Sequence, residues 1–400
     1  RYDDAEILFY DRINYATLYR LSAARQRIEM LERLFPDGLD QLPRLSKPDM
    51  QAFTLSALGT AYVSGGQPER AAPQFARAND IYATMTRSDY LSIGLGNLSN
   101  ALRLSSELYE AEHSARRALV LTHEPEDSFW KAINLYWLGL ALAARGDGDG
   151  REQSNARNGA DALTAFRRAL RLFRSQNEYE GVTYAYLAQR AAWRGEYASA
   201  RRLADHAWEL AHYWRFERDF IRAACRQGQA ALGLSEFNVA DDRLHHALTR
   251  ARAVNDAENE LSALTSLAEL RRRQRNLDDA RELLDQVWEG AARGPYPLEH
   301  ADALNVLAQI ERDAGNTDAA IQAATQAYTK AWCDGISADG SQCYAYWWGL
   351  QAAKAHLAAL GAPVPDLQPF TLDGREPMPE VEIDPGDEYH VGDRAVEDEV

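Results

Sequence analysis

The chain has 400 residues, of which 46% are apolar and 26% charged, and its formal net charge is −16. This composition supplies a core, but no stretch reaches the roughly 18–20 continuous apolar residues of a membrane span. Nucleic acid and anionic membranes are poor partners for such an acidic chain, because phosphate binding depends on clustered positive charge. Three cysteines without paired spacing favour a reducing, cytoplasmic location.

Residues 1–49 are expected to form capping helices at the N-terminal end of a helical array. Several aromatic residues fall in this stretch, among them Phe9, Tyr10 and Tyr15. The chain begins at Arg1 without an initiator Met, so we expect a longer polypeptide with further sequence upstream.

Residues 50–332 carry a helical repeat. Its clearest copy is Leu58-Gly59-Thr60-Ala61-Tyr62, followed by Gly66, Ala71, Phe75 and Ala78. Internal spacing of this kind is the signature of stacked hairpins. The usual step is 40 residues, and the single longer step contains an insertion at 146–160 that we interpret as a surface loop. The alanines expected to open each second helix are Ala71, Ala111, Ala162, Ala200, Ala240, Ala280 and Ala320.

This pattern resembles the tetratricopeptide repeat family. The resemblance implies an all-α, right-handed superhelical solenoid of about seven hairpins, with the first helix of each hairpin lining a concave surface. Small residues let paired helices approach closely while larger side chains fill the space between them. No convincing alternating apolar run occurs, so essentially no sheet is expected.

A row of polar residues on the first helices is the candidate binding site. Positions two residues beyond each repeat leucine are rich in amides and carboxylates, and arginines follow three residues later. Side-chain amides can hold a peptide backbone, and Arg can hold a carboxylate. The alternative is a set of solvated positions on an open groove. The candidate residues are Asn100, Arg103, Gln189, Arg222, Gln229, Glu269, Arg272, Asn305, Gln309 and Arg312.

The sequence has no recognisable catalytic or cofactor motif. Phosphate-binding loops, nucleophile elbows and dinucleotide fingerprints do not occur in a usable context. The nine histidines lack metal-ligand spacing. We therefore expect no enzyme activity, no metal site and no cofactor.

The C-terminal part consists of a loop and capping helix at 333–361 and an acidic, proline-containing tail at 362–400. The segments Lys330–Gly335 (KAWCDG), Tyr344–Leu350 (YAYWWGL) and Gly361-Ala362-Pro363 resemble the closing segment of bacterial STAND-type NTPases. Eleven acids against two arginines give residues 373–400 a net charge of −9. The tail is expected to be extended, and either solvated or lying in the groove as a competitor of the partner.

The sequence thus predicts a non-catalytic recognition scaffold that binds a protein or peptide. The STAND resemblance implies the sensor arm of a larger bacterial signalling or defence NTPase, with the NTPase domain upstream. Two alternatives remain open, a stand-alone adaptor or co-chaperone and a regulatory subunit of an effector protease.

Overall fold

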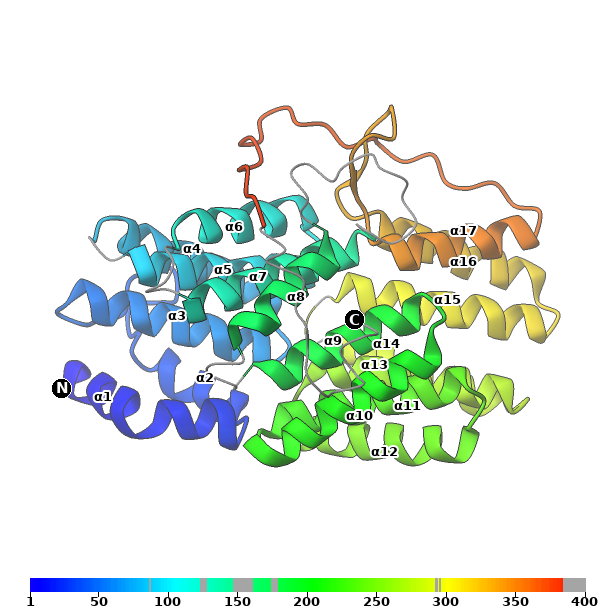
Figure 1. The fold of residues 1–400 in the computed structure, drawn as a ribbon, viewed down its shortest axis with the longest axis horizontal. Coiled ribbons are helices and arrows are strands. Elements are labelled where there is room, and N and C mark those ends of the chain that lie inside the picture. Colours follow the sequence, from blue (N-terminus) through cyan, green and yellow to red (C-terminus); the bar gives the residue numbers. More distant parts are fainter. Residues whose placement is uncertain are drawn as a thin grey trace.

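The fold is built almost entirely of helices (Figure 1). The computed structural model describes residues 1–85, 88–122, 128–146, 161–173, 179–291, 294 and 296–383. Within this part of the chain, consecutive helices pack as pairs, and each pair stacks on the next. The expected all-α helical-repeat solenoid is therefore confirmed.

Seven hairpins follow one another, in the number that the alanine spacing predicted. They are α3 (Pro48–Ser64) with α4 (Pro68–Ala83), α5 (Ser88–Leu104) with α6 (Leu108–Val120), α7 (Ser128–Ala144) with α8 (Ala162–Phe173), α9 (Glu180–Trp193) with α10 (Tyr197–Trp214), α11 (Glu217–Gly233) with α12 (Phe237–Val254), α13 (Ala257–Arg273) with α14 (Leu277–Ala291), and α15 (Pro297–Asp313) with α16 (Thr317–Trp332).

Small residues set the distance between the paired helices. The seven predicted alanines all lie near the start of the second helices, and each is at most 1% exposed. At Gly59, an added Cβ would lie 2.9 Å from the Phe75 ring, and at Gly139 it would lie 2.8 Å from the Phe166 ring. These glycines let a ring of the second helix rest on the backbone of the first, as in close-packed helix pairs.

Other elements cover both ends of the array. Before the first hairpin come α1 (Tyr2–Leu8), two short π-helical segments η1 (Phe9–Ile13) and η2 (Ala16–Arg20), and α2 (Ala24–Glu32). After the last hairpin, β1 (Gly335–Ile336) pairs antiparallel with β2 (Cys343–Tyr344), and α17 (Trp347–Ala359) follows. The expectation of no sheet missed this ribbon, because strands of two residues are too short to show an alternating pattern.

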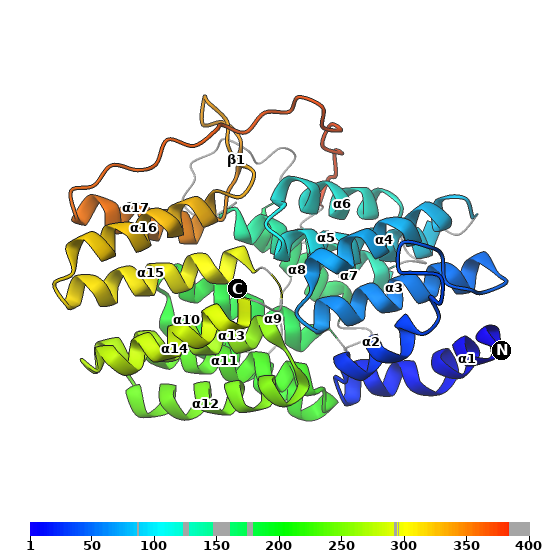
Figure 2. The ribbon, with the colours of Figure 1, turned by 180° about the vertical axis from the view of Figure 1, so that it is seen from behind.

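The superhelix closes on itself. Arg103 on α5 forms an ion pair with Glu258 on α13, with 3.2 Å between Nη2 and Oε1. Trp348 on α17 donates from its indole N–H to the carbonyl oxygen of Ala143 at the end of α7, at 2.8 Å. Figures 1 and 2 show the N-terminal hairpins beside the C-terminal ones from both sides. These contacts join the early hairpins of the array directly to the late ones.

The described part of the acidic tail, residues 362–383, is here called the C-terminal strap. It is extended, as expected, and crosses from α17 to the neighbourhood of α6 (Figure 1). Phe370 is 4% exposed, and its backbone N–H donates to the carbonyl oxygen of Ile336 at 3.0 Å. The strap is thus packed on the protein, which corrects the solvated reading for this segment. Residues 384–400 and residues 147–160 of the predicted insertion lie outside the described residues.

Candidate ligand-binding site

Four of the predicted site residues meet in one cavity. Gln189, Gln229, Glu269 and Gln309 lie on α9, α11, α13 and α15, with 40 residues between successive members. All four line a cavity of about 380 Å³. Stacking keeps equivalent positions of successive hairpins on the same side of the solenoid, which explains why the row converges.

The rest of the cavity wall is polar and aromatic. Most of it comes from α13 and α15, and the aromatic residues come from the turn between α9 and α10. The wall includes Trp193, Tyr197, Ser262, Thr265, Ser266, Arg273, Glu299, Asp302 and Val306.

Two carboxyl groups of α15 face the cavity one turn apart. Burial raises the pKa of Glu299 to about 8, and the nearby Asp302 adds to the rise. Burial also raises the pKa of Asp302 to about 7, although a hydrogen bond from Tyr346 opposes the rise. The Tyr346 hydroxyl donates to Asp302 Oδ2 at 2.8 Å. Desolvation disfavours the charged form of a carboxyl, so both groups retain protons into the neutral range.

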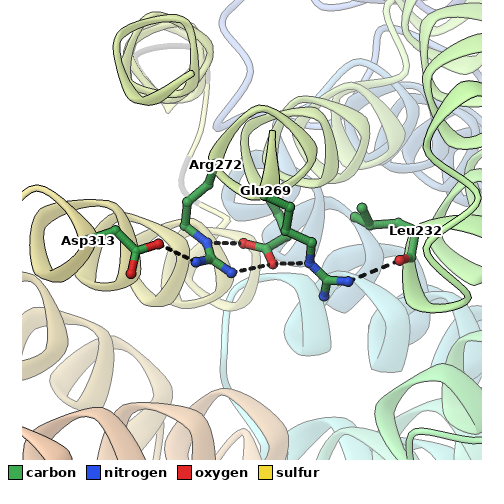
Figure 3. A network of polar contacts seen from close by, with 5 residues as sticks. Leu232, Glu269, Arg272 and Asp313 are labelled. Atoms are coloured by element: carbon green, nitrogen blue, oxygen red, sulfur yellow. Dashed lines mark hydrogen bonds and ion pairs between the residues drawn. The ribbon is translucent and has the colours of Figure 1, made fainter. Parts of the chain in front are cut away.

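Glu269 is held by arginines, as Figure 3 shows. Arg272 Nε donates to Glu269 Oε2 at 2.7 Å, and Arg273 Nε donates to Oε1 at 2.6 Å. Arg272 also bonds Asp313, and Arg273 donates to the carbonyl oxygen of Leu232 at 3.0 Å. Burial disfavours the Glu269 carboxylate, but these hydrogen bonds together outweigh it, and the pKa of Glu269 lies below its ordinary value. The Glu269 charge is thus balanced within the protein.

The three glutamines of the cavity differ in their hydrogen bonding. Gln229 donates to Ser262 Oγ at 3.0 Å and to Ser266 Oγ at 3.1 Å. It also accepts from Arg226 at 2.8 Å. Gln189 and Gln309 form no side-chain hydrogen bond within the described part of the chain. Their amides are therefore available to a ligand.

Two predicted arginines are buried and do not line this cavity. Arg103 and Arg222 are each 8% exposed. Arg103 pairs with Glu258, and Arg222 pairs with Asp219 at 3.4 Å and lies over the Tyr186 ring at 5.3 Å. Both guanidinium groups thus have acidic partners within the chain, and a role in holding a ligand carboxylate stays a prediction.

The remaining predicted residues also lie away from the cavity wall. Asn100 is half-buried and accepts from Arg103 at 3.1 Å. Asn305 is 5% exposed and donates to the carbonyl oxygen of Gly349 at 3.0 Å. Arg312 is exposed, and Arg272 is bonded to Glu269 and Asp313. The structure therefore divides the predicted set into a cavity row of four and a surrounding set of six.

Sequence reasoning missed Glu299 and Thr265 as members of the site. These residues are not at the row position, which was counted from the repeat leucines. Their signal was present as an acidic pair, Glu299 and Asp302, at helical spacing in the first half of a first helix. Such a pair is expensive to bury without a partner, which marks it as a feature to follow.

No group of three or more His, Cys, Asp or Glu side chains that could hold a metal ion occurs among the described residues. None of the helices described here is long and apolar enough to span a membrane.

No protein-family model and no curated protein sequence matches the chain. Among solved structures, a Rap protein complexed with competence and sporulation factor is similar, with 13% identity and a TM-score of 0.52, covering 90% of this chain and 97% of that one. A STAND protein with a tetratricopeptide repeat sensor from Pyrococcus horikoshii has 13% identity and a TM-score of 0.44, covering 82% of this chain and 47% of that one. Yeast Tom70 has 15% identity and a TM-score of 0.40, covering 90% and 78%. The first likeness shows the tetratricopeptide-type solenoid fold.

Proposed function

We propose that the chain is a non-catalytic recognition scaffold that binds a peptide segment of a partner protein in this cavity. The observation that carries this proposal is the convergence of four equivalent positions, Gln189, Gln229, Glu269 and Gln309, on one wall. A cavity of about 380 Å³ suits a few side chains of a peptide and is too small for a folded domain. Free amides can donate to and accept from a peptide backbone without reading its sequence.

In this proposal, one residue takes part both in ligand binding and in the closure of the superhelix. Trp193 lines the cavity and also stacks on Trp348 of α17, with ring centroids 5.5 Å apart. A ligand that contacts Trp193 would bind the closed superhelix and an opened one with different affinities, because opening would move Trp193 away from Trp348. Such a difference in affinity couples a binding site to a conformational change. Ligand binding would in this way change the conformation that an attached domain experiences.

The larger context that we propose is the sensor arm of a bacterial, cytoplasmic STAND-type NTPase. It is supported by the resemblance carried by residues 330–335, 344–350 and 361–363. A stand-alone adaptor and a regulatory subunit of an effector protease are the alternatives. The full gene decides between them, because an upstream phosphate-binding loop belongs only to the first.

Peptide selection tests the scaffold function. A phage-displayed random heptapeptide library is panned against the purified chain, and the enriched peptides are titrated by tryptophan fluorescence. We expect the double variant Gln189→Ala/Gln309→Ala to bind them roughly tenfold more weakly, since two hydrogen bonds are lost. Gln326→Ala is the matched control, because Gln326 is exposed on α16.

Two outcomes would contradict the proposal. If no peptide is enriched, the chain is not a peptide-binding scaffold. If the enriched peptides bind the double variant and the wild type equally well, the cavity is not where they bind.

A further inference from the structure

One part of the cavity wall carries two carboxyl groups that no direct ion pair neutralises within the described residues. Its charged wall residues are Glu269, Arg273, Glu299 and Asp302. Glu269 is balanced by Arg272 and Arg273, so Arg273 is not free to serve the other acids. Glu299 and Asp302 form no ion pair within the residues that the structure describes.

The basic groups nearest to this acidic pair are engaged elsewhere. Arg103 on α5 pairs with Glu258 on α13, and Arg226 on α11 donates to Gln229 and Ser262. The charged groups that face Glu299 are Asp302, Glu258, Arg226 and Arg103. Tyr346 and Arg226 face Asp302. Burial outweighs the attraction of the arginines and raises the pKa of both carboxyl groups, so a bound cation would favour their ionised forms.

A buried hydroxyl elsewhere in the cavity wall is also without a hydrogen-bond partner in the described part of the chain. Thr265 of α13 lines the cavity and is 8% exposed, and its Oγ1 is buried without a hydrogen-bond partner. An unpaired buried polar atom costs free energy, which a bound donor would recover. The free amides of Gln189 and Gln309 add two more oxygens that can accept from the same ligand.

Together these groups offer more acceptors than a ligand ammonium can use. The acceptors are both oxygens of Glu299, the second oxygen of Asp302, the Thr265 hydroxyl and the two amide oxygens. An arginine side chain has five N–H donors, whereas a lysine has three. The aromatic rings of Trp193 and Tyr197 lie in the same wall, and guanidinium groups stack well on such rings.

We propose that the cavity binds an arginine side chain of its peptide ligand, with the guanidinium between Glu299 and Asp302. This inference rests on the proposed function and adds the chemistry that selects the peptide. The guanidinium brings a positive charge between them, and the two carboxyl groups release their protons to solvent as it binds.

A pair of capped tripeptides tests the inference. Acetyl-Ala-Arg-Ala-amide and its citrulline counterpart have nearly the same shape and differ in charge. Calorimetry with the full chain at pH 8.5 should give at least roughly tenfold tighter binding of the arginine peptide, because charge-assisted hydrogen bonds are lost in citrulline. Glu299→Gln and Asp302→Asn should remove this preference. Glu289→Gln, at an exposed position on α14, should keep it.

The pH dependence gives a second readout on the wild-type chain. Both carboxyl groups have raised pKa values, about 8 for Glu299 and about 7 for Asp302, and must lose their protons to hold a cation. Affinity for the arginine peptide should therefore rise between pH 6 and about pH 9, while affinity for the citrulline peptide stays level. Equal binding of the two peptides, or no binding of either, would overturn the inference. The heptapeptide selection tests the scaffold function independently, because it does not require an arginine in the ligand.

Discussion

At the residue scale, one backbone conformation recurs in all seven hairpin turns. The second residue after each of the seven first helices has a positive φ. In the six turns whose next residue the structure describes, the N–H of that residue returns to the helix, as when Asn276 donates to the Arg271 carbonyl at 2.9 Å. This is the common glycine-terminated helix end. Four turns have glycine there, but three have other residues, which cost roughly 1 kcal/mol in this conformation. The positions are Gly66, Ser106, Gly146, Gly195, Ser235, Arg275 and Gly315.

Arg275→Gly should stabilise the protein. Arg275 is exposed, and no side-chain hydrogen bond of it occurs in the described structure. Relief of the strain is partly offset by the freedom that glycine adds to the unfolded chain, so we expect a gain of about 0.5 kcal/mol. Urea unfolding followed by circular dichroism measures it.

The reverse change supplies the control. Gly315→Ala should lose about 0.5 kcal/mol, from the same backbone strain with the same unfolded-chain offset, since no atom lies within 4 Å of the added Cβ. If Arg275→Gly instead lowers stability, the Arg275 side chain contributes more than its backbone costs.

At the element scale, the hairpins were predictable because their packing is local and repeated. Each buried alanine contacts a helix that is its neighbour in sequence, so the spacing of alanines carries the pairing. The same logic placed Gln189, Gln229, Glu269 and Gln309 together. It failed for Arg103, because the partner that buries it, Glu258, is 155 residues away, and no repeat spacing encodes that contact.

Ala71→Asp should disrupt the first hairpin. Ala71 is 0% exposed at the contact of α4 with α3, so the substitution buries an unpaired carboxylate, at a cost of several kcal/mol. Ala76→Asp is the matched control, because Ala76 is exposed on the same helix. Thermal unfolding followed by circular dichroism should show a large fall in melting temperature for Ala71→Asp and little change for Ala76→Asp. Equal melting temperatures of the two variants would mean that the carboxylate at position 71 reaches solvent and is not buried.

At the scale of the whole molecule, contacts between the two ends of the array hold the superhelix closed. Arg145, after α7, forms a buried ion pair with Glu112 of α6 and donates to the carbonyl oxygen of Cys343 in β2 at 2.7 Å. Its guanidinium also lies over the Tyr344 ring at 4.0 Å. One arginine thus joins two early helices to the late ribbon. Removing one partner of such a buried pair is costly, since the other charge is left uncompensated.

The C-terminal strap makes the same connection from outside. Phe370 packs against Tyr109 of α6, with ring centroids 5.4 Å apart, and against Tyr344 of β2 at 4.6 Å. Arg375 donates to Glu110 of α6 at 3.2 Å and to Asp334 at 3.1 Å. None of the residues that line the cavity belongs to the strap. For residues 362–383, the structure therefore favours a role in closing the superhelix over competition with the ligand.

Phe370→Ala should loosen this closure. The side chain is 4% exposed, and truncating a buried Phe costs about 3 kcal/mol. The strap contains no helix or strand, so the loss should appear as local detachment rather than global unfolding. Hydrogen exchange should speed up at the Phe370 amide, in β1 and β2, and in α6. Leu372→Ala, at a position 47% exposed, should leave these rates unchanged. Equal rates in the two variants would show that the superhelix stays closed without the strap, held by Arg145 and by the stacking of Trp193 on Trp348.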